Sequence, residues 1–401
     1  MARLLALLTL AGCFAPEIST GVPCSSTRQC PDGQVCDPAS DRCERMAGPD
    51  VDASGVDDAL AACDPGEVLV GDACTIPLAE VAPAPASAAG CDTGDANNGR
   101  SIAIDGGNRL YVAFRCGATQ DGFVAASANG GATAAMPVAL GVAGIDRMAV
   151  LGGARKHAYI AMTGAAGVVF GRTEDGGATW STQTLDSVRP DEGWGVSLAA
   201  AGSSVFVAAQ IGGDIRVWRN ASSGTGSFAA VDVAFSSVFG ELVANPATGE
   251  VWLGGDTPQL HVRKSADGAS FAATVDPPGS YGYSEWALGG GGLFVTGSAG
   301  TFTRISLADP TMAAPFAATL PSAVARGRAL AVAPDETVYV ASQASGNAVT
   351  IHRFAPGSAT GTSRAVAGAT GPHVVAGPGT AAPYVFTNMA TTKVMLGVAV
   401  F

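Results

Sequence analysis

The 401-residue sequence is poor in charge, and poorest in lysine. Charged residues make up 14% of the chain, and lysine occurs at only three positions, 156, 264 and 393. The formal net charge is −12, and no stretch concentrates basic residues into a stripe. A phosphate backbone requires a dense positive surface, so the composition argues against nucleic acid as a partner.

Several common chemical motifs are also missing. The four histidines (157, 261, 352 and 373) are scattered, with no His-Glu-x-x-His motif and no acidic cluster at metal-ligand spacing. The sequence has neither a phosphate-binding loop nor a Gly-x-Ser-x-Gly elbow. No apolar run reaches the roughly 20 residues that a membrane-spanning helix needs. We therefore expect no metal, no cofactor and no transmembrane helix.

The chain is instead rich in glycine and carries a repeat. Its 54 glycines and 47% hydrophobic residues suit short buried strands joined by tight turns. After position 100, an aromatic residue within a strand of small residues recurs at spacings of 48, 47, 46, 42, 45 and 45 residues. These aromatics are Tyr111, Tyr159, Phe206, Trp252, Phe294, Tyr339 and Tyr384. Self-similarity at this period predicts an all-β fold, a seven-bladed β-propeller with four strands in each blade.

The third repeat illustrates the expected blade, with strands beginning at Val196, Val205, Ile215 and Phe228. The last repeat ends at Phe401, within its third strand. An unpaired third strand would leave an open edge. We therefore expect a segment before the first repeat, residues 75–81, to supply the missing outer strand and close the ring.

The N-terminus has the composition of an export signal. One arginine precedes an apolar run from Leu4 to Leu10, and a small-residue site ends at Cys13. Residues 10–13 read LAGC and resemble a bacterial lipoprotein signal, which implies that Cys13 is the acylated first residue of the mature chain. Phe14 follows in place of aspartate, which in this family implies the outer membrane. The alternative is an ordinary signal peptide with an incidental cysteine.

Eight cysteines remain once Cys13 carries the lipid. They are Cys24, Cys30, Cys36, Cys43, Cys63, Cys74, Cys91 and Cys116. An even remainder predicts four disulfides in an oxidising compartment. Cys91 and Cys116 flank the first two propeller strands, where a disulfide would lock the ring closure.

These features divide the chain into five parts. A signal peptide at 1–12 precedes the lipidated cysteine and a small disulfide-rich module at 13–43, whose cysteine spacing fits zinc poorly. Residues 44–62 form an acidic linker, and residues 63–90 comprise a disulfide hairpin, the closing strand and a Pro/Ala linker. The propeller occupies residues 91–401.

Three turns share a signature between the expected third and fourth strands. Residues 173–180 read TEDGGATW, residues 127–133 read SANGGAT, and residues 265–271 read SADGASF. The acidic or amide side chain is expected to bond N–H groups of its own turn, and the glycines to adopt positive φ. These turns resemble the Asp-box of bacterial neuraminidase (BNR) repeats. The resemblance implies an Asp-box propeller, a group that includes sialidases, other glycosidases and non-catalytic receptors.

A polar or aromatic residue stands about eleven positions before each repeat aromatic, where the inner strand should begin and rim the central channel. These residues are Arg100, Arg147, Trp194 beside Gly195, Glu241, Tyr283, Arg328 and His373. Converging arginines can clamp a carboxylate, and Trp194 with Trp286 can stack on a sugar ring. The candidate ligand-binding residues are therefore Arg100, Arg147, Arg328, Trp194, Trp286 and His373.

By residue type, this set resembles the arginine triad and tyrosine–glutamate pair of sialidases, which implies Tyr283 with Glu241 or Glu285 as catalytic groups acting on acidic sugars. The sequence departs from that family, because it lacks a Phe-Arg-Ile-Pro-like segment, has seven repeats in place of six, and offers no identifiable acid/base aspartate. Two other interpretations stay open: the polar residues solvate the channel and pair with one another, or they bind a ligand without catalysis. We expect a monomeric outer-membrane lipoprotein that binds an envelope glycan or protein as a non-catalytic scaffold, with the sialidase-like glycosidase as the alternative.

Overall fold

The computed structural model describes residues 22–23, 34–37, 42–45, 68–70, 73–75, 78–81, 90–93, 100–129, 135–190, 195–231, 233, 239–256, 260–272, 285–289, 292–296, 301–306, 316–319, 326–343, 349–366, 369–376, 383–389 and 393–398. The chain divides into two compact units, Met1–Leu60 and Ala61–Phe401. No helix in the described part is long and apolar enough to cross a bilayer.

The first unit contains one small antiparallel sheet. Its strands are β1 (Val22–Pro23), β2 (Gln34–Asp37) and β3 (Arg42–Arg45), in the order β1-β3-β2, with Cys36 opposite Cys43. The signal peptide, Cys13, Cys24, Cys30 and the acidic linker lie outside the described residues. Lipidation and the disulfides of this module therefore stay predictions.

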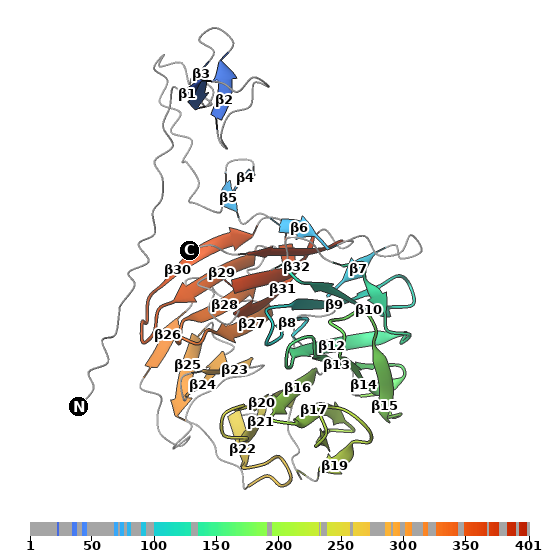
Figure 1. Ribbon diagram of the computed structural model, residues 1–401. Coiled ribbons are helices and arrows are strands. Elements are labelled where there is room, and N and C mark those ends of the chain that lie inside the picture. The colour runs from blue at the N-terminus through green and yellow to red at the C-terminus, as the bar shows by residue number, and fades with distance from the viewer. Residues whose placement is uncertain are drawn as a thin grey trace, which may run out of the picture. The chain divides into compact units, whose positions relative to one another are not determined.

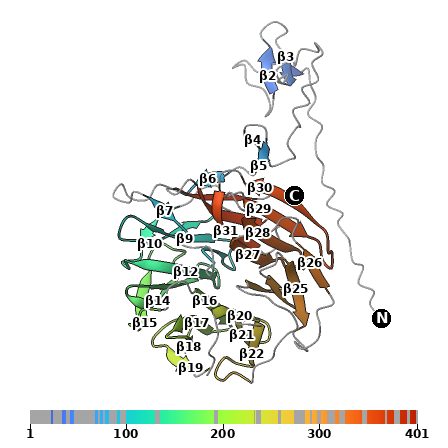
Figure 2. The same cartoon turned by 180° about the vertical axis from the view of Figure 1, so that it is seen from behind.

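The second unit is a β-propeller of antiparallel sheets that follow one another around a ring (Figures 1 and 2). The first three sheets consist of β7 (Cys91–Asp92), β8 (Ile102–Ile104), β9 (Leu110–Cys116), β10 (Asp121–Ser127) and β11 (Val138–Ala139); β12 (Ile145–Gly152), β13 (Ala158–Gly164), β14 (Gly167–Thr173) and β15 (Ser181–Asp186); and β16 (Val196–Ala201), β17 (Ser204–Ile211), β18 (Asp214–Asn220) and β19 (Ala229–Val231). The strands of the third repeat thus follow the predicted pattern.

The remaining sheets complete the ring. They consist of β20 (Phe239–Ala244), β21 (Val251–Asp256) and β22 (Leu260–Ser265); β23 (Trp286–Gly289), β24 (Gly292–Thr296), β25 (Thr301–Ser306) and β26 (Phe316–Thr319); β27 (Arg326–Val332), β28 (Val338–Gln343), β29 (Val349–Phe354) and β30 (Gly361–Val366); and β31 (Ala369–Ala376), β32 (Pro383–Met389) and β33 (Lys393–Val398), joined by β6 (Leu78–Glu80). A separate hairpin pairs β4 (Val68–Val70) with β5 (Ala73–Thr75).

The number of complete blades differs from the sequence-based expectation. In the part of the chain that the structure describes, six sheets have four strands or more, so six complete blades are found where seven were predicted. The sheet β20-β21-β22, at the position of the fourth repeat, has three strands in the described part of the chain. Residues 273–284, which follow its last turn, lie outside the described residues.

The ring closes through a segment from before the first repeat. Strand β6 pairs antiparallel with β33, with Ala79 opposite Leu396, and supplies the outer strand that the sequence predicted. A disulfide joins Cys91 in β7 to Cys116 in β9, with a Cα–Cα distance of 4.1 Å. Val81 and Leu396 pack into one buried cluster with residues of the first sheet. Closure therefore combines backbone pairing and apolar packing, and the disulfide fastens β7, the strand that follows β6, to the first sheet.

The Thr173–Trp180 turn between β14 and β15 has the geometry expected from its sequence. Asp175 accepts hydrogen bonds from the Thr179 N–H and hydroxyl, at 3.0 and 2.6 Å, and from the Thr173 hydroxyl, at 2.8 Å. These bonds hold the pKa of Asp175 low, at about 2. Gly177, at φ 90°, donates its N–H to the Thr173 hydroxyl oxygen and lies against the ring of Tyr111 in the preceding sheet. The turn therefore fastens one sheet to the next.

Candidate functional site

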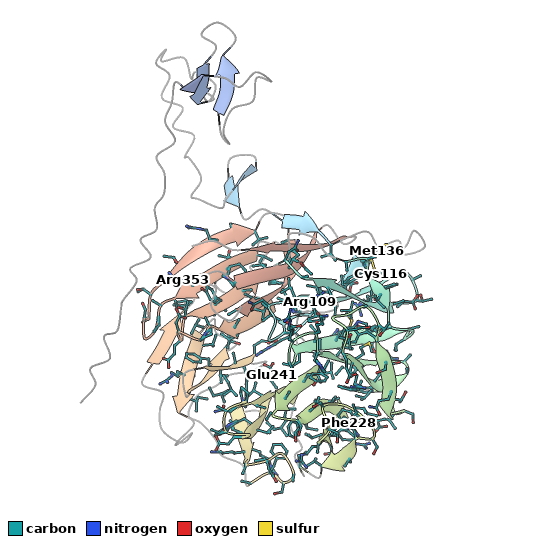
Figure 3. The ribbon with its side chains drawn as sticks, in the orientation of Figure 1. Arg109, Cys116, Met136, Phe228, Glu241 and Arg353 are labelled. Carbon is teal, nitrogen blue, oxygen red and sulfur yellow. A yellow bond between two sulfur atoms is a disulfide. The ribbon has the colours of Figure 1, made fainter. Side chains whose placement is uncertain are left out.

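The beginnings of the inner strands meet at one end of the ring. Arg100 precedes β8, Arg147 lies near the start of β12, and Glu241 lies in β20. Figure 3 shows Glu241 toward the middle of the ring. Successive inner strands run in the same sense around a propeller, so these positions share one channel mouth.

The central contact of this mouth is an ion pair between Arg100 and Glu241. Arg100 Nε lies 3.1 Å from Glu241 Oε1, although the two residues belong to the first sheet and the β20-β21-β22 sheet. The exposed fractions of their side chains are 34% for Arg100 and 11% for Glu241. The pair therefore connects sheets that are not neighbours in the ring, and one partner stays partly open to solvent.

Glu241 is held from a second side by the backbone of the next sheet. Its other carboxylate oxygen accepts a hydrogen bond from the backbone N–H of Trp286. Burial raises the pKa of the Glu241 carboxyl, while Arg100 and the Trp286 N–H act in the opposite direction. Both oxygens of Glu241 are thus engaged, so the group is fixed in place as the counter-charge of Arg100.

Arg100 retains hydrogen-bonding capacity that Glu241 does not use. Its Nη2 atom is buried and makes no hydrogen bond among the described residues, and the Nε contact to Glu241 is an ion pair without hydrogen-bond geometry. A buried donor without an acceptor costs about 1–3 kcal/mol, more when the group is charged. Guanidinium donors of this kind match a bidentate carboxylate. The arginine is consequently suited to receive an anion.

Two other predicted residues lie close to the channel mouth. Arg147 is 8% exposed, and its Nη1 donates a hydrogen bond of 3.2 Å to the Asp146 carbonyl. His373, in β31, is 3% exposed, and its Nδ1 accepts a hydrogen bond of 3.5 Å from the Ser101 N–H, directly after Arg100. Both are buried polar residues, and His373 lies where the last sheet meets the first.

The prediction that Trp286 stacks on a ligand is wrong. Trp286 is fully buried, in a cluster with Trp252 and Leu293 between the β20-β21-β22 sheet and the next one. A Cβ atom on Gly254 would lie 1.9 Å from its indole ring, so the ring fills the space that this glycine leaves. The indole is part of the core and has no open face.

The remaining predicted site residues are described only in part. Trp194 and Tyr283 lie outside the described residues, as does the side chain of Arg328, whose backbone pairs with Ser342. The convergence of the three arginines therefore stays a prediction, and so does the tyrosine–glutamate pair. Glu285 is 6% exposed, and its backbone exchanges hydrogen bonds with Thr296. Within the described ranges, no group of three or more His, Cys, Asp or Glu side chains is placed to hold a metal ion.

Sequence reasoning missed two hollows on either side of β15. One has a volume of about 360 Å³ and includes Phe170, Arg172 and Gln183 in its lining. The other has a volume of about 530 Å³ and lies beside Val142, Ala166 and Val169. Small residues and hydroxyls line much of both hollows, and such residues give no motif in the sequence. The one feature that could have indicated the hollows is the open edge that an outer strand of a blade presents.

No family model matches this chain, and no curated protein matches its sequence. Solved structures do resemble it. A chain of the mitotic checkpoint complex has a TM-score of 0.57 at 10% identity, covering 82% of this chain and 95% of that one. YCF48 bound to a D1 peptide has a TM-score of 0.51 at 14% identity, covering 79% and 99%.

The BP39L lectin from Burkholderia pseudomallei has a TM-score of 0.57 at 14% identity, covering 76% of this chain and 96% of the lectin. At these identities the likeness extends to architecture and not to function, because propellers of one shape serve unrelated roles. The comparisons thus show that the chain belongs among β-propellers and leave its ligand to be argued from its own residues.

Proposed function

We propose that this protein is an exported outer-membrane lipoprotein whose propeller binds an anionic ligand, a carboxylate of an envelope glycan or protein, without catalysing a reaction. The observation that supports the proposal is the Arg100 guanidinium at the channel mouth, whose side chain is 34% exposed and which Glu241 contacts at Nε. A ligand carboxylate can approach this partly exposed guanidinium and accept charge-assisted hydrogen bonds from it.

The same contacts favour binding over catalysis. In the sialidase-like alternative, a glutamate must be free to polarise a tyrosine. Glu241 instead faces Arg100 with one oxygen and the Trp286 N–H with the other. These two contacts occupy the carboxylate, while burial raises the pKa of Glu241. Likenesses to a lectin and to a peptide-bound propeller are compatible with a scaffold that binds.

Calorimetric titration of the full chain with N-acetylneuraminic acid, galacturonic acid and neutral galactose tests the proposal. We expect one or both acids to bind, galactose not to bind, and Arg100→Ala to abolish binding. Arg155→Ala is the matched control, because Arg155 is exposed in the turn at the other end of β12. Absence of binding by either acid would overturn the assignment of an acidic sugar to this mouth.

The variant Glu241→Gln distinguishes carboxylate binding at the channel mouth from glycosidase activity there. Removing the competing negative charge should strengthen carboxylate binding, by about tenfold if roughly 1.4 kcal/mol of competition is lost. A fluorogenic sialoside tests turnover in parallel. Release of the fluorophore by the wild type that is lost in Glu241→Gln would establish the glycosidase instead.

The envelope location has its own test. Metabolic labelling with palmitate in a bacterial host should mark the wild-type chain and not Cys13→Ala, and the label should fractionate with the outer membrane. Cys13→Ala that is still labelled, or a wild-type chain that is not, contradicts the lipid anchor.

A further inference from the structure

We propose that the outer edge of β15 (Ser181–Asp186) is a docking site for an extended peptide of a partner protein, in which acidic and small apolar side chains alternate. This site lies on the outside of the propeller. The inference is independent of the channel mouth and goes beyond the function proposed for it.

The outer edge of β15 is long and open. β14 pairs with one edge of β15, and no strand pairs with the other in the part of the chain that the structure describes. β15 has six residues, as has the outer strand β30, whereas the outer strands β11, β19 and β26 have two, three and four. In an antiparallel pair, alternate residues point their N–H and C=O groups away from the partner, so β15 offers such groups to a further strand.

The composition of β15 leaves most of this edge unprotected. Natural edge strands are usually blocked by lysine, proline or inward-pointing charges. Residues 181–185 read STQTL, which contains none of these. Protection is confined to the end of the strand, where Asp186 pairs with Arg216 and the register with β14 shifts. Ser181, Thr182 and Thr184 are exposed. An edge of this kind can accept an added strand through main-chain hydrogen bonds.

The two hollows lie on opposite faces of β15. Phe170 lies opposite Gln183 and Arg172 opposite Ser181, so these four side chains share one face. Phe170 also packs on Phe228 of the next sheet, with ring centroids 4.7 Å apart. The hollow of about 360 Å³ therefore opens between the β12–β15 sheet and the β16–β19 sheet.

The other face carries Val169 opposite Thr184, beside the preceding sheet. Its hollow of about 530 Å³ is bounded by residues 141–143, which lead from the first sheet, and by the β13–β14 turn at 165–166. Successive side chains of a strand point to opposite faces. A peptide paired with β15 would therefore direct alternate side chains into the two hollows.

The linings define the chemistry of those side chains. Arg172 and Ser181 give the first hollow hydrogen-bond donors and a positive charge, while Gln183 donates to the Gly226 carbonyl across it at 3.2 Å. Arg172 pairs with Glu174, but Glu174 is more than half exposed, and an exposed pair of this kind is worth little. A peptide carboxylate can thus share the guanidinium. The second hollow is lined by Val142, Ala143, Ala165, Ala166 and Val169, among others, and suits valine or alanine.

Binding of synthetic peptides to the full chain tests the site. The probe is acetyl-SEVEVES-amide, in which glutamate and valine alternate, and the control is acetyl-SEEVVES-amide, which has the same composition without alternation. We expect the probe to bind at least about tenfold more tightly, measured by fluorescence anisotropy, since only alternation fills both hollows. Hydrogen exchange should show new protection within residues 181–186. Equal affinity of the two peptides, or no binding by either, overturns the proposal.

Matched variants locate the bound peptide. Ala166→Trp fills the second hollow and should weaken the probe about tenfold or more, whereas Ala247→Trp, at an exposed alanine in the β20–β21 turn, should not. Arg172→Gln should weaken the probe but leave a glutamine version, acetyl-SQVQVQS-amide, unchanged. Arg100→Ala should affect neither peptide, which separates this site from the channel mouth. Probe binding that survives Ala166→Trp contradicts the site.

Discussion

Asp105 and Lys156 join two neighbouring sheets of the propeller: Asp105 Oδ2 accepts a hydrogen bond of 2.7 Å from the backbone N–H of Lys156. The same oxygen accepts the Tyr111 hydroxyl at 3.0 Å, and the other accepts the N–H groups of Gly107 and Arg109. Asp105 is 1% exposed. Burial, followed by the nearby Asp105 charge, raises the pKa of Tyr111. A single buried carboxylate therefore organises its own turn and the contact to the next sheet.

Asp105→Asn should destabilise the propeller by about 2–3 kcal/mol. An amide NH₂ in place of Oδ2 cannot accept either the Lys156 N–H or the Tyr111 hydroxyl, and leaves buried donors unsatisfied. Urea unfolding of the two proteins measures the change. Tyr111→Phe removes one donor and should cost less than Asp105→Asn. A loss below about 0.5 kcal/mol in Asp105→Asn would mean that the bond between the sheets adds little.

Two glycines in the β18–β19 turn allow the cost of backbone strain to be measured apart from the cost of a steric clash. Gly224 and Gly226 have similar φ values, 76° and 73°. A Cβ on Gly224 would lie 2.8 Å from the Phe170 ring of the preceding sheet, whereas a Cβ on Gly226 would meet nothing within 4 Å. Gly226→Ala should cost about 1 kcal/mol from backbone strain alone, and Gly224→Ala at least about 1–3 kcal/mol more. Thermal unfolding measures both, and equal losses would contradict the packing role of Gly224.

The Cys91–Cys116 disulfide should stabilise the closed ring. The bond spans 25 residues, which corresponds to about 3.5 kcal/mol in the chain-entropy description of disulfide stabilisation. The double variant Cys91→Ala/Cys116→Ala should unfold at lower denaturant by a comparable free energy while the propeller still forms, because β6 and β33 pair independently. A variant as stable as the wild type would show that backbone pairing alone closes the ring.

The propeller can be predicted from the sequence because the same packing contact recurs in successive sheets. An aromatic recurs at the same position of each repeat, as Tyr111 and Phe206 illustrate, because its ring fills the space beside a turn glycine of the next sheet. A Cβ on Gly177 would lie 3.4 Å from the Tyr111 ring, and a Cβ on Gly268 would lie 2.0 Å from the Phe206 ring. Because that contact repeats from sheet to sheet, both the aromatic spacing and the turn signature recur along the chain and can be recognised there.

The candidate site is less predictable because it depends on distances across the ring. Position in the repeat indicates that Arg100 and Glu241 lie at the same mouth, but not that the two side chains meet at 3.1 Å. The same reasoning placed Trp286 at the mouth, as the partner of Trp194 in stacking on a sugar ring. Packing against Gly254 buries the Trp286 ring instead. Contacts that do not repeat from sheet to sheet leave no periodic signal.

His352 should make the stability of the propeller depend on pH. It is 2% exposed, its Nε2 lies 2.8 Å from the Ser342 hydroxyl, and burial lowers its pKa to about 4 from an ordinary value of 6.5. Between these two values, the unfolded chain binds a proton that the folded chain does not. The free energy of unfolding attributable to His352 should therefore fall as pH drops from 6.5 toward 4, by up to about 3.4 kcal/mol, and level off below 4.

Urea unfolding of wild type and His352→Leu at several pH values between about 4 and 7 isolates this contribution, because carboxylates elsewhere titrate equally in both proteins. The stability difference between the two should shift in favour of His352→Leu as the pH falls. His157→Leu is the control, since His157 lies in the β12–β13 turn and is only half-buried. A difference between wild type and His352→Leu that is constant across this range would mean that His352 protonates in the folded chain as readily as in the unfolded one.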